Sequence, residues 1–349
     1  MRDQILIAAC VLGVASGCAP PPCDDGPCVV AEDLAGAALA VRAPADDDVW
    51  IVGSSPEDGS DGPLAAHWDG AGWDLLDMSQ WPGLELWSAW VCDDEVVFVG
   101  SAGTIIEYDR VTRVARQVAA QDDPSAVFFT VWGASGSDLW AVGRGATADG
   151  EPGLPLLWRR IDGTWMEWDD PLYDGGAPGD ILLTVHGTSA EDVWIVGSAG
   201  TALHWDGRGL RRIPTDQEID TLQAPIMGVD ASAGRPMAVG GPGLGTVLSW
   251  DGGRWASDAP DPYASYHGLC AAPGGAAMAV GNAGARATRI DGEWRADHDL
   301  GITPMTMRDY HACAWTPSGA VWTVGGHFAS RPLRSGVVAY TGADSIEPL

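Results

Sequence analysis

One short apolar segment recurs seven times in this chain, and each copy ends in glycine. The copies end at Gly53, Gly100, Gly143, Gly197, Gly240, Gly281 and Gly325. Consecutive glycines in this series are 47, 43, 54, 43, 41 and 44 residues apart. A nearly fixed period of this length is typical of a repeat fold and argues against several unrelated domains.

The repeated segment predicts a strand that is buried on both faces. Val49-Trp50-Ile51-Val52 and Val193-Trp194-Ile195-Val196 are apolar at every position instead of alternating with polar residues. Sheets that pack face to face around an axis bury both faces, because each lies between two neighbours. The sequence therefore predicts an all-β fold, a seven-bladed β-propeller of four-stranded antiparallel blades.

The residues around each repeated segment predict the other strands of a blade. Segments such as 128–133 and 182–187 come before it and would line the central channel. Glycine-rich turns follow it, as at 197–201, and a third strand then ends on an aromatic residue such as Trp205. An Asp-Gly pair such as Asp206-Gly207 makes the next turn, toward an outer fourth strand.

Residues 34–349 form the predicted propeller, and two ways of closing its ring are open. Repeat seven has enough sequence for four strands of its own, the last near Ser345 to Leu349. Alternatively, residues 29–32 could add the outer strand of that blade.

The first 17 residues predict a lipoprotein-type signal peptide. A positive start at Arg2 precedes an apolar run, and small residues lie before Cys18. Cleavage before Cys18 would make it the first residue of the mature protein, lipidated with acyl chains such as palmitate. Ala15 departs from the usual Leu, Val or Ile. An ordinary cleaved secretory signal is the alternative, and a retained cytoplasmic start comes last. Residues 18–33, rich in Pro and Asp, predict a stiff tether.

The cysteines fit an oxidising compartment. Cys23 and Cys28 could close a small loop, while the odd number that remains predicts at least one free thiol among Cys92, Cys270 and Cys313. Cys270 and Cys313 fall on the first strands of neighbouring blades, but the repeat alignment offsets them by one residue. They would point to opposite faces, so we expect two small core residues in preference to a disulfide.

Charge excludes some partners. The chain has 48 acidic and 19 basic residues, every basic one is arginine, and the net charge is -29. Such a chain repels phosphate backbones and anionic headgroups, so nucleic acid is excluded and membrane attachment would depend on lipid alone. We expect a monomer without a cofactor or metal.

The chain resembles bacterial envelope lipoproteins with an Asp-box-like β-propeller and, more distantly, photosystem II assembly-factor-like propellers. The resemblance covers residues 34–349 and rests on the Val-Trp-x-Val-Gly-x-x-Gly-Thr core and on the Asp-Gly turn before a Trp. Only residues 249–255 come close to a full Asp-box. The resemblance implies the fold and an envelope location, and Cys18 without a following Asp implies the outer membrane of a Gram-negative bacterium, with a secreted protein as the alternative.

One matched set of residues is a candidate ligand site at the channel mouth: Tyr266, His267, Arg308, Tyr310 and His311. The two histidines occupy equivalent positions in repeats six and seven, where two imidazoles could share a metal or a ligand. Similar repeats also produce matched pairs without any function. His67 and His204, before the third-strand aromatic, favour a structural role. Insertions at 54–63, 144–155, 169–180 and 326–335 are further places for function or for neutral surface loops.

Catalytic patterns are weak. Sialidase-like catalysis needs several convergent arginines, whereas Arg159-Arg160 and Arg211-Arg212 should lie toward the rim. Asp46 to Asp48 and residues 58–62 lack the alternating carboxylates of a calcium loop and are expected to cap turns. We therefore predict no enzyme but a binding or scaffold protein of the envelope that holds a protein or a glycan. The alternative is a hydrolase or lyase of envelope or extracellular polysaccharide.

Overall fold

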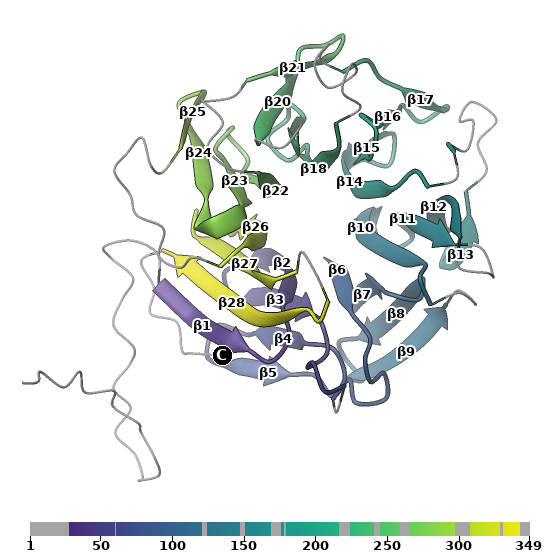
Figure 1. The fold of residues 1–349 in the computed structure, drawn as a ribbon, viewed down its shortest axis with the longest axis vertical. Helices are drawn as coiled ribbons and strands as arrows, with labels where there is room; N and C mark the ends of the chain where they lie inside the picture. Colours follow the sequence, from purple (N-terminus) through teal and green to yellow (C-terminus); the bar gives the residue numbers. More distant parts are fainter. Residues whose placement is uncertain are drawn as a thin grey trace, which may run out of the picture.

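Seven four-stranded antiparallel sheets form the structure, a computed structural model that describes residues 28–59, 61–120, 124–146, 151–168, 176–177, 179–215, 224–240, 245–258, 265–296, 308–328 and 331–342. The predicted signal peptide, Cys18, Cys23 and most of the tether lie outside these residues. Figure 1 looks down a ring in which the sheets radiate from a centre surrounded by β2, β6, β10, β14, β18, β22 and β26. The predicted seven-bladed propeller is confirmed.

Six blades consist of consecutive strands, numbered from the channel outward. Blade 1 has β2 (Ala38–Ala45), β3 (Asp48–Gly53), β4 (Ala65–Trp68) and β5 (Trp73–Leu75). Blade 2 has β6 (Leu86–Val91), β7 (Glu95–Gly100), β8 (Thr104–Asp109) and β9 (Val114–Ala119). Blade 3 has β10 (Val127–Ser135), β11 (Asp138–Ala146), β12 (Pro152–Ile161) and β13 (Thr164–Glu167).

The second half of the ring follows the same plan. Blade 4 has β14 (Leu182–Ser189), β15 (Asp192–Gly197), β16 (Ala202–Trp205) and β17 (Leu210–Arg212). Blade 5 has β18 (Ile226–Asp230), β19 (Met237–Gly240), β20 (Thr246–Trp250) and β21 (Trp255–Ser257). Blade 6 has β22 (Tyr266–Ala271), β23 (Ala277–Gly281), a 3-10 turn η1 (Asn282–Gly284), β24 (Arg286–Ile290) and β25 (Glu293–Ala296).

Blade 7 is closed by the beginning of the chain. It contains β26 (Tyr310–Trp315), β27 (Val321–His327) and β28 (Arg334–Thr341), and its outer strand is β1 (Cys28–Leu34), which pairs antiparallel with β28. In Figure 1 the purple β1 lies beside the yellow β28. The second of the two closures is therefore the one adopted. The propeller begins at Cys28 and not at Leu34, so the predicted tether overlaps a strand.

Each repeated apolar segment is the second strand of a blade and is buried on both faces, as predicted. Ile51, Phe98 and Ile195 are all 0% exposed. The side chains pack between neighbouring blades. Trp322 of blade 7, for example, meets Trp73 of blade 1 edge to face with ring centroids 5.6 Å apart. Burial between blades, and not within one sheet, thus supplies the hydrophobic core.

Blades 6 and 7 are joined by a disulfide, which corrects the sequence-based expectation. Cys270 on β22 and Cys313 on β26 are bonded, with their Cα atoms 5.6 Å apart. The one-residue offset between the two cysteines is real, but it favours the disulfide and does not prevent it. Neighbouring blades stack face to face, so a residue that points toward the next blade must meet one on the opposite face of that blade. The offset is what brings the two sulfur atoms together.

The remaining cysteines follow a different pattern. Cys28 is disulfide-bonded, and Cys23, its expected partner, lies outside the described residues. Cys92 is free, as the odd number predicts. Burial, together with the charge of Glu95, raises the pKa of the Cys92 thiol to about 11, so this thiol stays protonated and unreactive at neutral pH.

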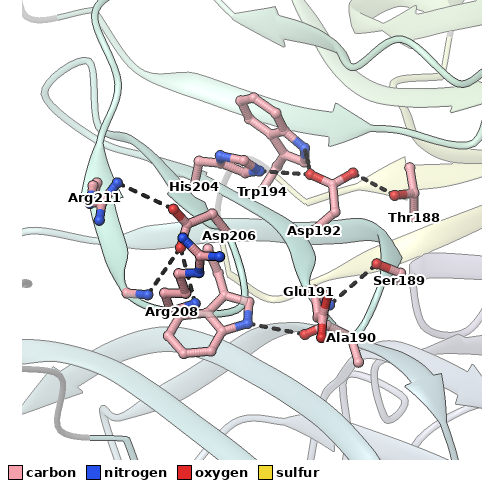
Figure 2. Close-up of polar contacts among 12 residues, drawn as sticks. Thr188, Ser189, Ala190, Glu191, Asp192, Trp194, His204, Asp206, Arg208 and Arg211 are labelled. Atoms are coloured by element: carbon pink, nitrogen blue, oxygen red, sulfur yellow. Dashed lines mark hydrogen bonds and ion pairs between the residues drawn. The ribbon is translucent and has the colours of Figure 1, made fainter.

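Two histidines take part in a repeated structural network. In blade 4, Asp192 accepts hydrogen bonds from Trp194 Nε1 at 3.0 Å, from His204 Nε2 at 2.6 Å and from the Thr188 hydroxyl (Figure 2). The His204 ring stacks on Trp194 at 4.0 Å. Asp48, Trp50 and His67 repeat this arrangement in blade 1. These contacts tie the second strand to the third, which agrees with the structural role expected for both histidines.

Blade 3 places arginine where those blades have histidine. Arg159 donates from Nε and Nη2 to the two carboxylate oxygens of Asp138, both at 2.8 Å. Its guanidinium also lies 4.5 Å from the centre of the Trp140 ring and contacts Trp168 and Trp205. Arg159 therefore acts as a buried ion pair and cation–π centre between blades 3 and 4.

Candidate functional site in the central channel

A β-bulge recurs in the innermost strand of every blade and determines what faces the channel. In each strand one residue is skipped by the pairing with the second strand, as at Trp87 between Leu86 and Ser88. The skipped residues are Leu39, Trp87, Phe129, Leu183, Met227, His267 and His311. A skipped residue leaves the ladder and redirects its side chain. Six of the seven keep partial exposure inside the ring, so solvent reaches them along the channel.

These residues line a chamber of about 390 Å³ at the end of the channel where the innermost strands begin. We call it the aromatic chamber. Trp87 meets Phe129 edge to face at 5.3 Å and His311 at 5.6 Å. Phe328 meets His311 at 4.8 Å and His267 at 5.3 Å. The chamber wall is therefore mainly apolar and aromatic, with contributions from all seven blades.

The two histidines of the chamber are held by hydrogen bonds within the fold. His267 Nε2 donates to the Asn282 side-chain oxygen at 2.7 Å, and His311 Nδ1 donates to the backbone carbonyl of Leu39 in blade 1. Burial lowers the pKa of both imidazoles, that of His311 to about 4, with the neighbouring charge of His267 as a further cause. Both rings are therefore neutral at pH 7.

The insertion in blade 7 supplies Phe328 and reaches across blade 1 to blade 2. Arg331 pairs with the buried carboxylate of Glu85, donating from Nη2 at 2.9 Å. Glu85 also accepts a hydrogen bond from Trp87 Nε1 at 3.1 Å. The carbonyl of Leu333 accepts one from the Ser54 hydroxyl at 3.2 Å. The insertion is thus fixed to the rim of the aromatic chamber and helps to position Trp87.

Small residues follow the skipped position because neighbouring blades approach closely there. Thr130 and Thr184 donate from their hydroxyls to the carbonyls of Leu183 and Met227 in the next blade, both at 2.7 Å. At Gly268 a Cβ atom would lie 2.5 Å from the His311 carbonyl oxygen and 2.9 Å from the Ala312 Cα. The backbone of blade 7 and the Val280 side chain, whose Cγ2 atom would be 2.9 Å away, leave no room for a side chain.

We expect Gly268→Ala to lower the free energy of unfolding by about 1–3 kcal/mol, because blades 6 and 7 must separate to admit the methyl group. Urea unfolding monitored by circular dichroism measures the change. Gly228→Ala is the matched control, since its nearest atoms would be 3.2 Å away, and it should cost less. Equal losses in the two variants would contradict the argument.

A second chamber, of about 260 Å³, lies toward the other end of the channel. We call it the disulfide chamber because Cys270 and Cys313 both line it, together with Trp90, Trp315 and Asp230. Asp230 accepts hydrogen bonds from the backbone N–H groups of Ser232 at 2.7 Å and Ala271 at 3.0 Å. Its carboxylate is therefore largely satisfied by the fold.

Arg42 lies where the two chambers meet and lines both. Its Nε donates to the Ala89 carbonyl at 3.0 Å and its Nη1 to the Val41 carbonyl at 3.4 Å. The guanidinium is 5.8 Å from the centre of the Trp90 ring. Burial lowers the pKa of Arg42, while the charge of Asp230 raises it. An arginine nevertheless keeps its proton in a protein.

Acid should weaken the fold through His311. Its pKa is about 4 in the folded protein and about 6.5 in the unfolded chain. The unfolded chain thus binds more protons than the folded protein between these pH values. The contribution of His311 to the free energy of unfolding is fully present above pH 6.5 and is lost as the pH falls toward 4. We expect a loss of at most about 2 kcal/mol at pH 5 from this group.

Urea unfolding at pH 7 and pH 5 tests this expectation. His311→Gln should lose less stability between the two pH values than the unsubstituted protein does. A variant with an unchanged pH dependence would contradict the assignment. The pKa values of His186 and His267 are also lowered by burial, so part of the acid sensitivity should remain in the variant.

The structure brings together only part of the residue set expected at the channel mouth. His267 and His311 line the aromatic chamber. Tyr266 and Tyr310 are each 2% exposed and pack in the core between blades. Arg308 pairs with Asp33 of the outer strand β1, away from the channel.

Sequence reasoning missed most of the chamber. The aligned position of the repeat that holds His267 and His311 in repeats six and seven holds Trp87, Phe129, Leu183 and Met227 in repeats two to five. A comparison of this position across all seven repeats would have identified these residues. Phe328 lies in the insertion 326–335 that the sequence marked as a place for function, but nothing in the sequence singled out this residue. Arg42 belongs to no repeated pattern, so no sequence signal indicated it.

The described residues contain no group of three or more His, Cys, Asp or Glu side chains that could hold a metal ion. Within the same residues, no helix is long and apolar enough to cross a membrane. The Asp46 side chain accepts a hydrogen bond from the Ser318 hydroxyl at 2.6 Å, and Asp48 belongs to the blade 1 network. These two carboxylates thus have structural partners.

Comparisons with known proteins establish the fold. No protein-family model and no curated protein matches the chain. Among solved structures, YCF48 bound to D1 peptide is 14% identical and has a TM-score of 0.61, with 89% of this chain and 94% of that one covered. U3-55K is 10% identical with a TM-score of 0.64, and the match covers 92% of this chain and 100% of that one. The WD40 repeats of RRP9 are 10% identical with a TM-score of 0.64, and the match covers 93% of this chain and 99% of that one. At these identities the likeness concerns the propeller fold, including the distant similarity to a photosystem II assembly factor.

Proposed function

We propose that this protein is a lipid-anchored binding module of the cell envelope that holds a protein partner on the acidic surface of its ring. The observation that carries the proposal is the charge of that surface. Ten arginines already form ion pairs with carboxylates of the same chain: Arg110, Arg113, Arg116, Arg159, Arg160, Arg211, Arg254, Arg295, Arg308 and Arg331. With 48 acidic and 19 basic residues in total, carboxylates outnumber cations by more than two to one.

A surface of this kind favours a partner with a basic patch. Charge complementarity accelerates association and suppresses wrong partners, and its effect weakens as salt screens it. YCF48, one of the structures with the same fold, is bound to a peptide, which is consistent with a protein partner. A glycan is the second ligand class, for which the chamber aromatics Trp87, Phe129 and Phe328 offer stacking surfaces.

Catalysis on polysaccharides is less well supported. Hydrolysis of a glycosidic bond commonly uses two carboxyl groups on either side of it. Among the described residues that line the two chambers, Asp230 is the one carboxylate, and backbone N–H groups hold it. We therefore propose binding rather than chemistry.

The envelope location is part of the proposal. The disulfide between Cys270 and Cys313 fits an oxidising compartment, and residues 1–18 have the pattern of a lipoprotein signal. Mass spectrometry of the mature amino terminus tests this part. We expect a diacylglyceryl group and an acyl chain such as palmitate on Cys18, and fractionation with the outer membrane. An unmodified terminus in the culture medium would support secretion instead.

Crosslinking in intact cells followed by affinity purification tests the partner. We compare the native protein with Cys18→Ser and expect a discrete protein that depends on the lipidated form. Its binding to the purified propeller should weaken steeply between low and physiological salt. A folded, membrane-bound protein that captures no protein partner, or one whose binding ignores salt, would overturn the proposal and favour a glycan.

A further inference from the structure

The aromatic chamber differs in charge from the rest of this acidic protein. Its described lining contains no aspartate or glutamate, although the chain has 48 of them. Arg42 is its one charged side chain, because burial keeps His267 and His311 neutral at pH 7. The chamber therefore presents a single positive charge below an apolar, aromatic wall.

Arg42 has a donor left for a ligand. Its Nε and Nη1 atoms bond to the carbonyls of Ala89 and Val41, which fixes the plane of the guanidinium. Within the described residues, the Nη2 atom of Arg42 has no hydrogen-bond partner. This atom is also not fully buried. Arg42 also forms no ion pair there. The cation is held in place but its charge is not neutralised by contact.

Asp230 does not remove this charge from the chamber. Its carboxylate lines the disulfide chamber and not the aromatic chamber, and two backbone N–H groups bond it. Asp230 acts on Arg42 through its charge but adds no carboxylate to the lining of the aromatic chamber. An anion inside the aromatic chamber therefore meets Arg42 and no acidic residue among the described residues that line it.

We propose that the aromatic chamber binds a small monocarboxylic acid with an aromatic or branched aliphatic group, whose carboxylate pairs with Arg42. The volume of about 390 Å³ falls in the lower part of the range for small-molecule pockets, about 300–1,000 Å³. Trp87, Phe129 and Phe328 contact the apolar group, and the Arg42 Nη2 donates to the carboxylate. This site lies inside the channel and is separate from the outer surface proposed for the protein partner.

Desolvation makes the pairing selective. A guanidinium in an apolar chamber interacts more strongly with an anion than it would in water. A neutral amide of the same shape gains the apolar contacts but lacks the charge interaction. The acid should therefore bind at least 10-fold more tightly than its amide, a ratio that a purely hydrophobic pocket would not produce.

Isothermal titration calorimetry on the folded protein tests the proposal. The probes are 3-phenylpropionate and 4-methylpentanoate, each compared with its own amide. We expect both acids to bind with an affinity at least 10-fold above that of the amides. Arg42→Gln should abolish this preference. Arg211→Gln, at an arginine with a 59% exposed side chain on the outer strand of blade 4, should leave binding unchanged.

A second variant covers the case in which Arg42→Gln fails to fold. Leu183→Trp fills the chamber from a partly exposed position and should weaken binding of the acids at least 10-fold while circular dichroism stays unchanged. The proposal is overturned if neither acid binds at millimolar concentration, if the amides bind as tightly, or if Arg211→Gln weakens binding as much as the chamber variants.

Discussion

A chain that lacks residues 28–34 is expected to lose its folded ring. These residues form β1, the outer strand of blade 7, where they pair with β28 and bury Val30 and Ala31 against the cluster that contains Trp322. Burial of each large apolar side chain stabilises by about 1.5–3 kcal/mol and each backbone hydrogen bond by about 0.5–1.5 kcal/mol. The sum of these contributions over the whole strand is comparable to the free energy of unfolding of a typical domain, about 5–15 kcal/mol.

Thermal unfolding and size-exclusion chromatography measure the loss, and a rearranged chain gives the decisive control. Cys28 pairs with Tyr340 near the end of β28, so a short glycine-rich turn after Gly342 followed by residues 28–34 should restore the strand from the other terminus. A ring that stays stable without these residues, or one that the rearranged chain fails to rescue, would contradict the role of β1.

A smaller substitution separates packing from pairing in the same strand. Val30 is 4% exposed and Val29 is 39% exposed. Val30→Ala should lower the free energy of unfolding by about 1–3 kcal/mol, whereas Val29→Ala should stay within about 0.5 kcal/mol.

Removal of the disulfide between blades 6 and 7 is expected to have the next largest effect. The bond joins cysteines 43 residues apart in the chain. The entropy that it removes from an unfolded loop of this length corresponds to about 4 kcal/mol. We expect the double variant with Cys270→Ala and Cys313→Ala to lose stability of this order in urea unfolding. Reductant should then change the stability of the variant much less than that of the native protein, because only the disulfide of Cys28 remains for it to reduce.

Cys92→Ser provides the matched control, because Cys92 is free. It should reduce stability much less than the double variant does, and it should leave the sensitivity to reductant intact. Mass spectrometry after alkylation without reductant should find Cys92 modified in the denatured protein and Cys270 and Cys313 protected. Alkylation of the latter two would show that the bond does not form.

Local rules explain why the architecture was predictable. The apolar segments ending at the seven glycines were long enough to show burial on both faces. The Asp-Gly pairs specified their turns, as at Asp69, whose carboxylate accepts the N–H groups of Ala71 and Gly72, each at 2.9 Å, while Gly70 has a φ of 87°. Side-chain hydrogen bonding and glycine's access to positive φ act over a few residues. The apolar segment recurs in all seven repeats, so the same local pattern predicted each blade.

The candidate site was predictable only where the repeat marked it. His267 and His311 were found because they recur 44 residues apart. Tyr266 and Tyr310 recur as well, but their side chains lie between blades. The bulge decides which of two adjacent residues faces the channel, and alternation of side chains in a regular strand does not indicate a bulge.

The sequence by itself determined the blades, their number and their buried strands, because those features depend on periodicity and on turn chemistry within each repeat. The tertiary structure decided how the ring closes through β1, how Cys270 meets Cys313, and how Arg42 comes to lie beneath Trp87, Phe129 and Phe328. Each of these features joins residues that are far apart in the sequence, so it depends on the arrangement of the sheets around the axis, which no single repeat encodes.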